Sequence, residues 1–312
     1  MNSMNQTNFK TYQRTEWDRK RHYKIDDKRE YPSSTTILSV KDKPALPTWA
    51  AKFTAQYASD KNSEILSKYI GDNKRKKVRD VKGMLGLLKN DITGEEYIKD
   101  CKGAPWRMSG EAMNIGSTAH AIISEFHDEE LKLREHDDEF GSEEAKRWFD
   151  SMIELEKKEK KLNSEFVRKL KNCIGSFLEW REDVHFVIVA SEFTVYSDTN
   201  KYAGTIDALG YINGVLTLID YKTSSGIWPE HDLQTVSYLD ALNEMYQRNQ
   251  IKIDGIVENI QIINFNKEGT LEKKNVQNHK EALDLFLCYK NAFVANQIWD
   301  SATKMTMAKN NQ

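Results

Sequence analysis

The sequence predicts an α/β (α+β) fold in which a mixed central β-sheet is flanked by helices and the first half of the chain is helical. Two observations carry this prediction. Residues 143–181 repeat large apolar side chains at the spacing of an amphipathic helix. Residues 186–222 and 257–276 instead hold short β-branched and aromatic runs separated by turn residues. Helical stretches before, between and after these runs can bury both faces of such a sheet.

The predicted elements follow one another along the chain as helices, three strands, a helix, two strands and a last helix. The early helices are expected at 48–70, 75–90, 110–127 and 143–181. Strands are expected from Phe186 to Tyr196, along both arms of 203–222, over 257–265 and over 270–276. Pro229 suits the first turn of a helix that runs to about Gln247, and a closing helix is expected from His279 to Trp299.

One domain is expected, because no internal repeat or low-complexity linker divides the chain. Residues 1–30 are polar and mildly basic and are expected to form a disordered or extended tail. The single domain then covers 31–312, with a mainly helical part at 31–182, the sheet core at 183–278 and a C-terminal helix at 279–312.

Composition bounds the class of protein. With 39% hydrophobic and 30% charged residues and no run of 18 apolar residues, the chain is expected to be soluble and not to associate with a membrane. Its three scattered cysteines indicate reduced thiols and a cytoplasmic location, in a prokaryotic or phage-infected cell, with a mitochondrial location favoured less. The acidic run 128–139 is expected to be a solvated loop.

A hairpin in the middle of the chain places two aspartates together. Asn213-Gly214 between two apolar runs predicts a two-residue type I′ turn, and in that register Asp207 lies opposite Asp220, with Cβ atoms about 5 Å apart. Lys222 projects from the same face. Opposed like charges destabilise a sheet unless a divalent cation lies between them. Solvated carboxylates on an exposed edge are the alternative, but apolar side chains on both faces of the hairpin favour a metal site.

Glu192 extends this acidic row if the preceding turn leaves residues 198–201 unpaired. Ser197 then pairs with Tyr202, and Glu192 lies opposite Asp207. The alternative is a glutamate in a salt bridge with a nearby Lys or Arg.

Four segments carry a resemblance. Gly204-Thr205-Ile206-Asp207 followed by Asp220-Tyr221-Lys222 resembles the core of the PD-(D/E)XK nucleases, in particular the RecB-like exonuclease branch. Gly116 to His120 resembles the Gly-x-x-x-His motif of that branch, and Gln234 to Tyr238 resembles its Gln-x-x-x-Tyr motif. Tyr31 to Trp49 resembles the opening of phage and mitochondrial single-strand exonucleases. The resemblance implies a restriction-endonuclease-like core.

The resemblance also implies a catalytic centre. Asp207 and Asp220 would hold one or two Mg²⁺ or Mn²⁺ ions, and Lys222 would orient or deprotonate the attacking water. His120 would complete the shell of one ion, although a lone histidine on a helix is more often a core residue.

Further residues are candidates for substrate binding. Gln234 and Tyr238 share one helix face, where they either pack on the sheet or contact Lys222 and a phosphate. The hydroxyls of Thr223 and Ser224 can meet phosphate oxygens. The opening segment offers Ser34, Thr35, Thr36 and Trp49 to a terminal phosphate and a stacked base, or it is an ordinary capped helix start. Lys74, Arg75 and Lys76 either contact phosphate or lie on a solvated helix face.

These observations predict a metal-dependent DNA exonuclease that works from free ends of single-stranded DNA in recombination, repair or phage DNA processing. A helicase, an annealing protein or a single-strand-binding protein are possible partners. The sequence holds no Walker-type loop, so no ATP is expected, and three separated cysteines predict no iron–sulfur cluster. An endonuclease of the same fold, including the CRISPR-adaptation type, and a catalytically silent DNA-binding module are the alternatives.

Overall fold

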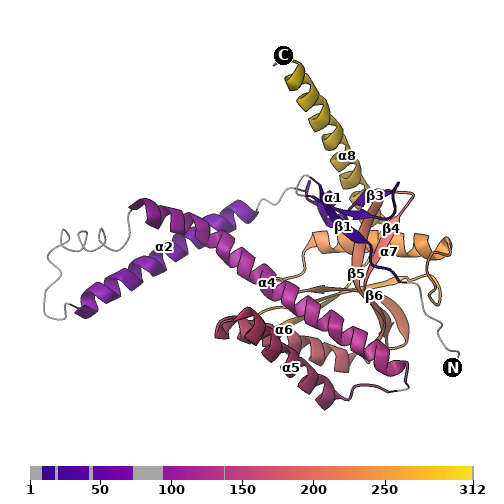
Figure 1. Ribbon diagram of the computed structural model, residues 1–312, viewed down its shortest axis with the longest axis horizontal. Helices are drawn as coiled ribbons and strands as arrows, with labels where there is room; N and C mark the ends of the chain where they lie inside the picture. The colour runs from indigo at the N-terminus through magenta and orange to yellow at the C-terminus, as the bar shows by residue number, and fades with distance from the viewer. Residues whose placement is uncertain (1–8, 18–19, 42–44, 73–93, 137, 311–312) are drawn as a thin grey trace. The chain divides into compact units, whose positions relative to one another are not determined.

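The computed structural model describes residues 9–17, 20–41, 45–72, 94–136 and 138–310 (Figure 1). The chain divides into two compact units, one of residues 1–41 and 115–312 and the other of residues 42–114. The single domain predicted from residue 31 would span both units and stays a prediction. The smaller unit forms because two helices pair with each other there: Tyr97 Oη donates to the Ala58 carbonyl at 3.1 Å, and Tyr57 Oη donates to Asp100 at 3.2 Å.

The larger unit is built on the predicted mixed sheet. Its strands, in spatial order, are β4 (Val187–Ser197), β5 (Tyr202–Ile212), β6 (Val215–Lys222), β7 (Asn259–Phe265) and β8 (Leu271–Asn275). β6 and β7 are parallel and the other pairs are antiparallel. Helix α7 (Pro229–Gln247) makes the crossover between the parallel strands, and it begins at the proline that predicted its start.

The hairpin of β5 and β6 has the predicted register. Ile212 pairs with Val215 and Ala208 pairs with Ile219. Asn213 and Gly214 have φ values of 50° and 81°, as both central residues of a type I′ turn require.

Helices cover the sheet on both faces, as predicted for a central pair of strands. Leu209 and Leu218 pack into one apolar cluster with residues of α7 and α8 (His279–Asn310), whereas their neighbours Ala208 and Ile219 pack into another. This second cluster contains residues of α4 (Gly94–Arg134), α5 (Ser142–Lys160) and α6 (Ser164–Asp183). Consecutive strand residues point to opposite faces, so each cluster covers one face of the hairpin.

Three helical predictions need comment. The stripe at 143–181 is two helices, because Lys161 adopts a left-handed φ of 52° and Asn163 caps α6. The helices expected at 48–70 and 110–127 lie within α2 (Ala45–Asp72) and α4. The helix expected at 75–90 lies outside the described residues. Among the described residues, no helix is both long and apolar enough to cross a membrane.

Three strands lie within the described residues of the N-terminal segment. β1 (Gln13–Trp17), β2 (Lys20–Lys24) and β3 (Glu30–Pro32) form an antiparallel sheet. Tyr23 and Tyr31 are buried, and their aromatic rings anchor this segment to the core. The polar composition of residues 1–30 gives no sign of this anchoring. The short helix α1 (Ser34–Leu38) follows directly.

Candidate active site

The hairpin brings Asp207, Asp220 and Lys222 together. Asp207 and Asp220 lie one residue beyond the last paired residues of the two strands. Asp207 Oδ2 accepts a hydrogen bond from the backbone N–H of Tyr221 at 2.8 Å, which holds its carboxylate against β6. Asp220 is only 2% exposed, and its Oδ2 lies 2.5 Å from Lys222 Nζ.

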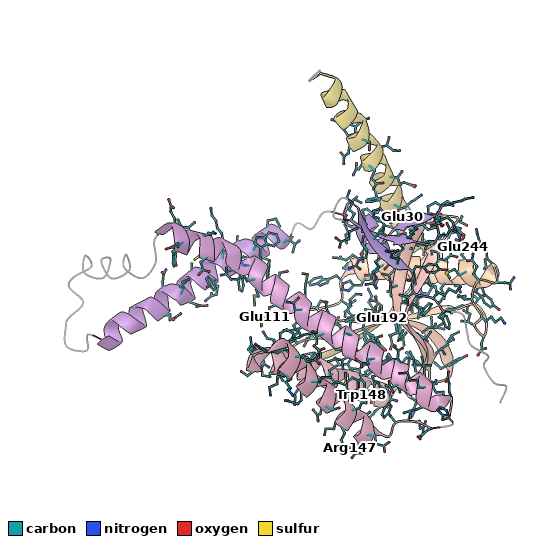
Figure 2. All side chains as sticks on the ribbon, in the orientation of Figure 1. Glu30, Glu111, Arg147, Trp148, Glu192 and Glu244 are labelled. Carbon is teal, nitrogen blue, oxygen red and sulfur yellow. The ribbon has the colours of Figure 1, made fainter. Side chains whose placement is uncertain are left out.

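Glu192, which is labelled in Figure 2, lies on the neighbouring strand β4. The pairing of Ser197 with Tyr202 is confirmed, and Glu192 lies between the pairs Ser191–Ala208 and Phe193–Ile206, opposite Asp207. Its φ of 46° is left-handed, a conformation that costs a glutamate about 1 kcal/mol or more within a strand. The paired residues on either side hold this conformation in place, and it changes the direction of the Glu192 side chain.

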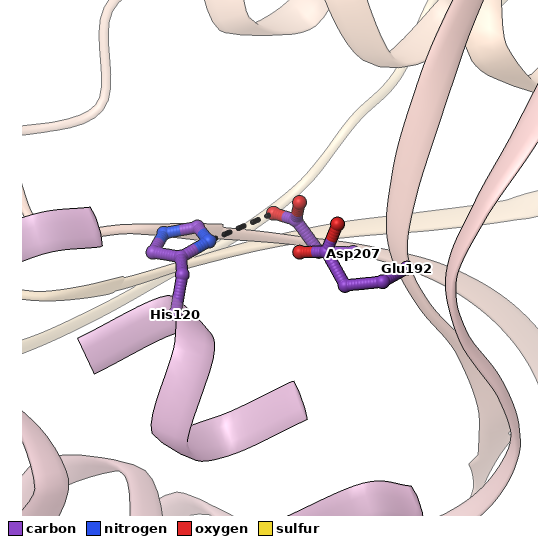
Figure 3. Close-up of side chains that lie close together, drawn as sticks. All are labelled: His120, Glu192 and Asp207. Carbon is purple, nitrogen blue, oxygen red and sulfur yellow. Dashed lines mark ion pairs between the residues drawn. The ribbon is translucent and has the colours of Figure 1, made fainter. Parts of the chain in front are cut away.

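His120, Glu192 and Asp207 form a possible metal site, which Figure 3 shows in close-up. One ligand atom from each lies within 4.8 Å of the others, and His120 Nδ1 is 3.8 Å from Asp207 Oδ2. Two carboxylates and an imidazole suit a divalent cation. Three of the four predicted metal ligands are thus gathered, while Asp220 is ion-paired with Lys222.

Burial shifts the pKa values of the acidic groups and of the histidine at the site. Burial raises the pKa of Glu192 to about 7, and the Asp207 carboxylate adds to the rise. Burial also raises the pKa of Asp220 to about 6, with Lys222 opposing the rise and Asp207 adding to it. The pKa of Asp207 is raised by burial as well. Burial lowers the pKa of His120 to about 4, and the positive charge of Lys222 lowers it further. At neutral pH His120 is therefore a neutral imidazole, the form that binds metal.

Glycines allow the close approaches that build the site. A Cβ on Gly116 would lie 2.5 Å from Thr223 Oγ1, so the glycine of the Gly-x-x-x-His segment lets α4 touch the end of β6. A Cβ on Gly204 would lie 2.1 Å from the ring of Tyr238, so the glycine before Asp207 lets α7 lie flat on β5.

The residues predicted to bind substrate beside the end of β6 already make hydrogen bonds within the fold. Gln234 Nε2 donates to Tyr238 Oη at 2.7 Å, and Tyr238 is buried. Tyr238 therefore packs on the sheet and holds Gln234, which is half-buried, so a contact of Gln234 with phosphate stays a prediction. Ser224 Oγ donates to the Gly226 carbonyl at 2.6 Å, while the carbonyl of Thr223 accepts from Lys267 Nζ.

The hydroxyls of the opening segment are used within the fold. Ser33 caps α1 by accepting from the Thr36 N–H at 3.0 Å, and Thr36 is buried. Ser34 is buried and accepts from Ser237 Oγ at 2.8 Å. Thr35 is exposed. Thr36 therefore takes part in a capped helix start, and Ser34 is bonded to other elements of the fold.

The remaining substrate-binding candidates are not part of the larger unit's described residues. Trp49 is 42% exposed and belongs to the smaller unit. Lys74, Arg75 and Lys76 lie outside the described residues.

Sequence reasoning missed one residue of the site. Arg14 of β1 donates from Nη2 to Thr205 Oγ1 at 3.1 Å and lies 3.8 Å from Glu192 Oε2. The signal was present as two short polar runs, 13–17 and 20–24, with Tyr23 as an apolar anchor in the second. Reading residues 1–30 as a tail concealed it.

A mixed sheet that carries Asp207 on one strand and Asp220-x-Lys222 on the next has the core of a nuclease. The chain belongs to the PD-(D/E)XK nuclease superfamily, because the model of that family matches residues 97–303, more than half of the chain. The sequence has no match among curated proteins.

Two solved structures are similar to parts of the chain. An alkaline exonuclease (LHK-Exo) from Laribacter hongkongensis has 11% sequence identity and a TM-score of 0.28, over 47% of this chain and 76% of its own. The crystal structure of SSO0001 has 11% identity and a TM-score of 0.26, over 46% of this chain and 70% of its own.

Proposed function

We propose that this nuclease is a Mg²⁺- or Mn²⁺-dependent DNA exonuclease that hydrolyses phosphodiester bonds from free ends of single strands. The observation that carries the metal-dependent part is the group of His120, Glu192 and Asp207, whose ligand atoms lie within 4.8 Å of one another. Lys222 beside Asp220 supplies the positive charge that phosphoryl transfer needs next to such a group.

Each residue has a separate task in this proposal. His120, Glu192 and Asp207 would hold the ion, and Asp220 holds Lys222 in place through the ion pair. A divalent ion bound there would supply acidity to a water molecule and offset negative charge on the phosphate. Lys222 donates hydrogen bonds that orient the attacking water and the phosphate oxygens. Water adds to phosphorus, the bond to the 3′ oxygen breaks, and the products are a 5′-phosphate and a 3′-hydroxyl.

The ligand types bear on the choice of metal. Mg²⁺ prefers oxygen ligands, whereas Mn²⁺ accepts an imidazole more readily. With His120 in the group, Mn²⁺ is expected to support cleavage at least as well as Mg²⁺.

The preference for free single-stranded ends rests on the exonuclease resemblance and on the unstacked bases of single strands. The test compares a linear single strand with a covalently closed circle of the same sequence, with duplex alongside, at one fixed salt concentration. Rapid loss of the linear strand while the circle persists supports an exonuclease. Equal cutting of both would make the protein an endonuclease, and binding without cutting would make it a DNA-binding module.

The proposed setting is DNA recombination, repair or phage DNA processing in the cytoplasm of a prokaryotic or phage-infected cell. A helicase, an annealing protein or a single-strand-binding protein would supply the single strand, because the proposed reaction uses no ATP.

A further inference from the structure

Arg14 is the cation that the N-terminal strands add to the acidic group. Its guanidinium lies 3.8 Å from Glu192 Oε2 and 3.1 Å from Thr205 Oγ1, and it lies over the ring of Tyr23 with 6.0 Å to the centroid. Thr205 is two residues before Asp207 and is itself bonded to Tyr23 Oη at 2.9 Å. Three groups therefore place Arg14 at the edge of the possible metal site.

The segment that carries Arg14 is fixed to the sheet. Tyr12 N–H donates to Thr194 Oγ1 at 3.2 Å, and the Thr194 N–H donates to the Lys10 carbonyl at 3.0 Å. The ring of Phe9 lies 4.5 Å from that of Phe193, centroid to centroid. This segment precedes the region that matches the family model, which begins at residue 97. Arg14 is therefore an addition to the part of the chain that defines the family.

The guanidinium has capacity to spare for a ligand. Arginine carries five N–H donors in a planar fork that matches phosphate, and the polar contacts found among the described residues use Nη2. Its side chain is 46% exposed, so it faces solvent as well as the carboxylates. A separation of 3.8 Å from Glu192 is too long for a hydrogen bond, so a phosphate oxygen would not have to displace one.

We propose that Arg14 binds a non-bridging oxygen of the substrate phosphate at or next to the bond that is cut. This inference rests on the proposed nuclease function and names a further substrate-binding residue for it. Two plainer roles compete with it. Arg14 could only tether β1 through Thr205, or it could only neutralise Glu192 until a cation binds.

The test measures binding of a fluorescein-labelled single-stranded oligonucleotide in a Lys222→Ala background, with Mg²⁺ present and a gel to verify that the strand stays intact. Arg14→Ala is expected to weaken the Kd about tenfold, as for loss of a half-exposed charged hydrogen bond. The slope of log Kd against log salt should fall by about 0.7, the amount for one phosphate contact on a single strand. Arg14→Lys should recover part of the affinity and most of the slope.

The matched control is Lys24→Ala, which removes one positive charge from the other face of the same strand pair. It should change neither quantity as much as Arg14→Ala does. Mn²⁺ affinity without DNA and the melting temperature are measured in parallel, with Arg14→Gln as the variant that keeps a donor for Thr205 if Arg14→Ala does not fold.

The competing roles give different results. A lower melting temperature with an unchanged Kd and slope would show a tether and overturn the inference. Tighter Mn²⁺ binding with an unchanged Kd for DNA would show a counter-ion for Glu192 and overturn it too. If the Lys222→Ala protein does not bind DNA and the wild type does not cleave it, the proposed function itself fails, and this inference fails with it.

Discussion

Two histidines on helix α4, two turns apart, each lie beside carboxylates and have opposite surroundings. His127 is completely buried, and both its ring nitrogens are paired, with Glu130 at 2.9 Å and Tyr221 Oη at 3.0 Å. Glu130 also accepts from Arg181. Burial favours the neutral form of Glu130, but the bonds from His127 and Arg181 outweigh it and lower its pKa. His120 instead lies beside carboxylates whose pKa values are raised.

The difference separates a structural polar group from a reactive one. In the His127 network (His127, Glu130, Arg181 and Tyr221) the ring nitrogens and both carboxylate oxygens are paired, which favours stability. The buried Nε of Arg181 has no hydrogen-bond partner among the described residues. In the metal-site group (His120, Glu192 and Asp207) neighbouring carboxylates repel each other inside the fold. Free energy stored in this way can be released by a cation, which is why perturbed pKa values concentrate at functional sites. The two groups should therefore respond oppositely to substitution.

The largest expected effect is on activity. Asp207→Ala, Asp220→Ala or Lys222→Ala should each lower the cleavage rate at least ~10²-fold, on the scale for loss of transition-state groups, and so should EDTA. The folded fraction should not change. Asp207→Ala and Asp220→Ala each remove one of the carboxylates that repel each other, and in Lys222→Ala the Asp220 carboxyl can take up a proton because burial already raises its pKa. Single-turnover rates and circular dichroism check this, with Glu179→Ala on the exposed face of α6 as the control. Wild-type rates in EDTA or in Asp220→Ala would contradict the proposed metal chemistry.

The His127 network should show the reverse pattern. His127→Ala leaves one buried oxygen of Glu130 and the buried Tyr221 hydroxyl without their partner, while Arg181 keeps the other Glu130 oxygen. The free energy of unfolding should therefore fall by about 3 kcal/mol. Mn²⁺ affinity, measured by calorimetry below the new melting temperature, should stay at the wild-type value. A variant of normal stability that has lost Mn²⁺ binding would reverse the assignment of the two histidines.

His120→Ala tests the other side of the comparison. Cleavage in Mg²⁺ should be crippled and partly rescued by Mn²⁺, and metal affinity should fall about tenfold or more. Stability should change little, because His120 is partly exposed. Full activity together with a loss of stability would make His120 a core residue, and the metal-site group would then be incomplete.

Local sequence patterns predict some positions of the site and leave others unpredicted. The pairing of β5 with β6 up to Ala208 and Ile219 follows from local rules, because Asn213-Gly214 selects one turn and thereby the register. Asp207 and Asp220 lie directly beyond that pairing. The strand period is broken at Asp207, since Ile206 and Ala208 pack into different clusters. His127 ends the helix expected at 110–127, and Glu130 belongs to the acidic run 128–139 that is predicted to be a solvated loop. That run instead continues α4 to Arg134 and buries Glu130. That burial depends on Arg181, which is distant in the sequence.

The conformation of Glu192 and the position of Arg14 could not be predicted from the sequence. The loop length correctly placed Glu192 opposite Asp207, but its left-handed φ has no local signal, since glutamate does not favour that conformation. Arg14 could not be placed at all, because its position depends on Tyr23 and Thr205 in other strands. Contacts between elements, unlike turns, leave little trace in one sequence.

Metal binding by the metal-site group should depend on pH. Because the pKa of Glu192 is about 7 and that of His120 about 4, protons compete with metal at the glutamate and not at the histidine near neutral pH. Mn²⁺ affinity should rise about tenfold from pH 6 to pH 8 and level off above that range. Calorimetry in buffers of different ionisation enthalpy should detect a proton released at pH 6 and almost none at pH 9. A constant affinity from pH 6 to pH 8 would contradict the raised pKa.

The smallest expected effect is on the stability of the metal-free protein. The folded-state pKa of Glu192, about 7, lies above its ordinary value of 4.5, so the folded protein holds this proton more tightly than the unfolded chain does. The group then costs nothing below about pH 4.5, where both states are protonated, and its cost grows as the pH rises to about 7. Glu192→Gln removes the titration, so its free energy of unfolding should match that of wild type at pH 5 and exceed it at pH 8.

This gain in the free energy of unfolding should stay below about 1 kcal/mol, because 36% of the side chain is exposed and solvent screens the charge. Urea unfolding in EDTA at both pH values measures it, with Glu179→Gln as the control. A gain that is equal at pH 5 and pH 8 would mean that the stored free energy is backbone strain at Glu192 rather than charge repulsion, and the contrast with the His127 network would no longer be electrostatic.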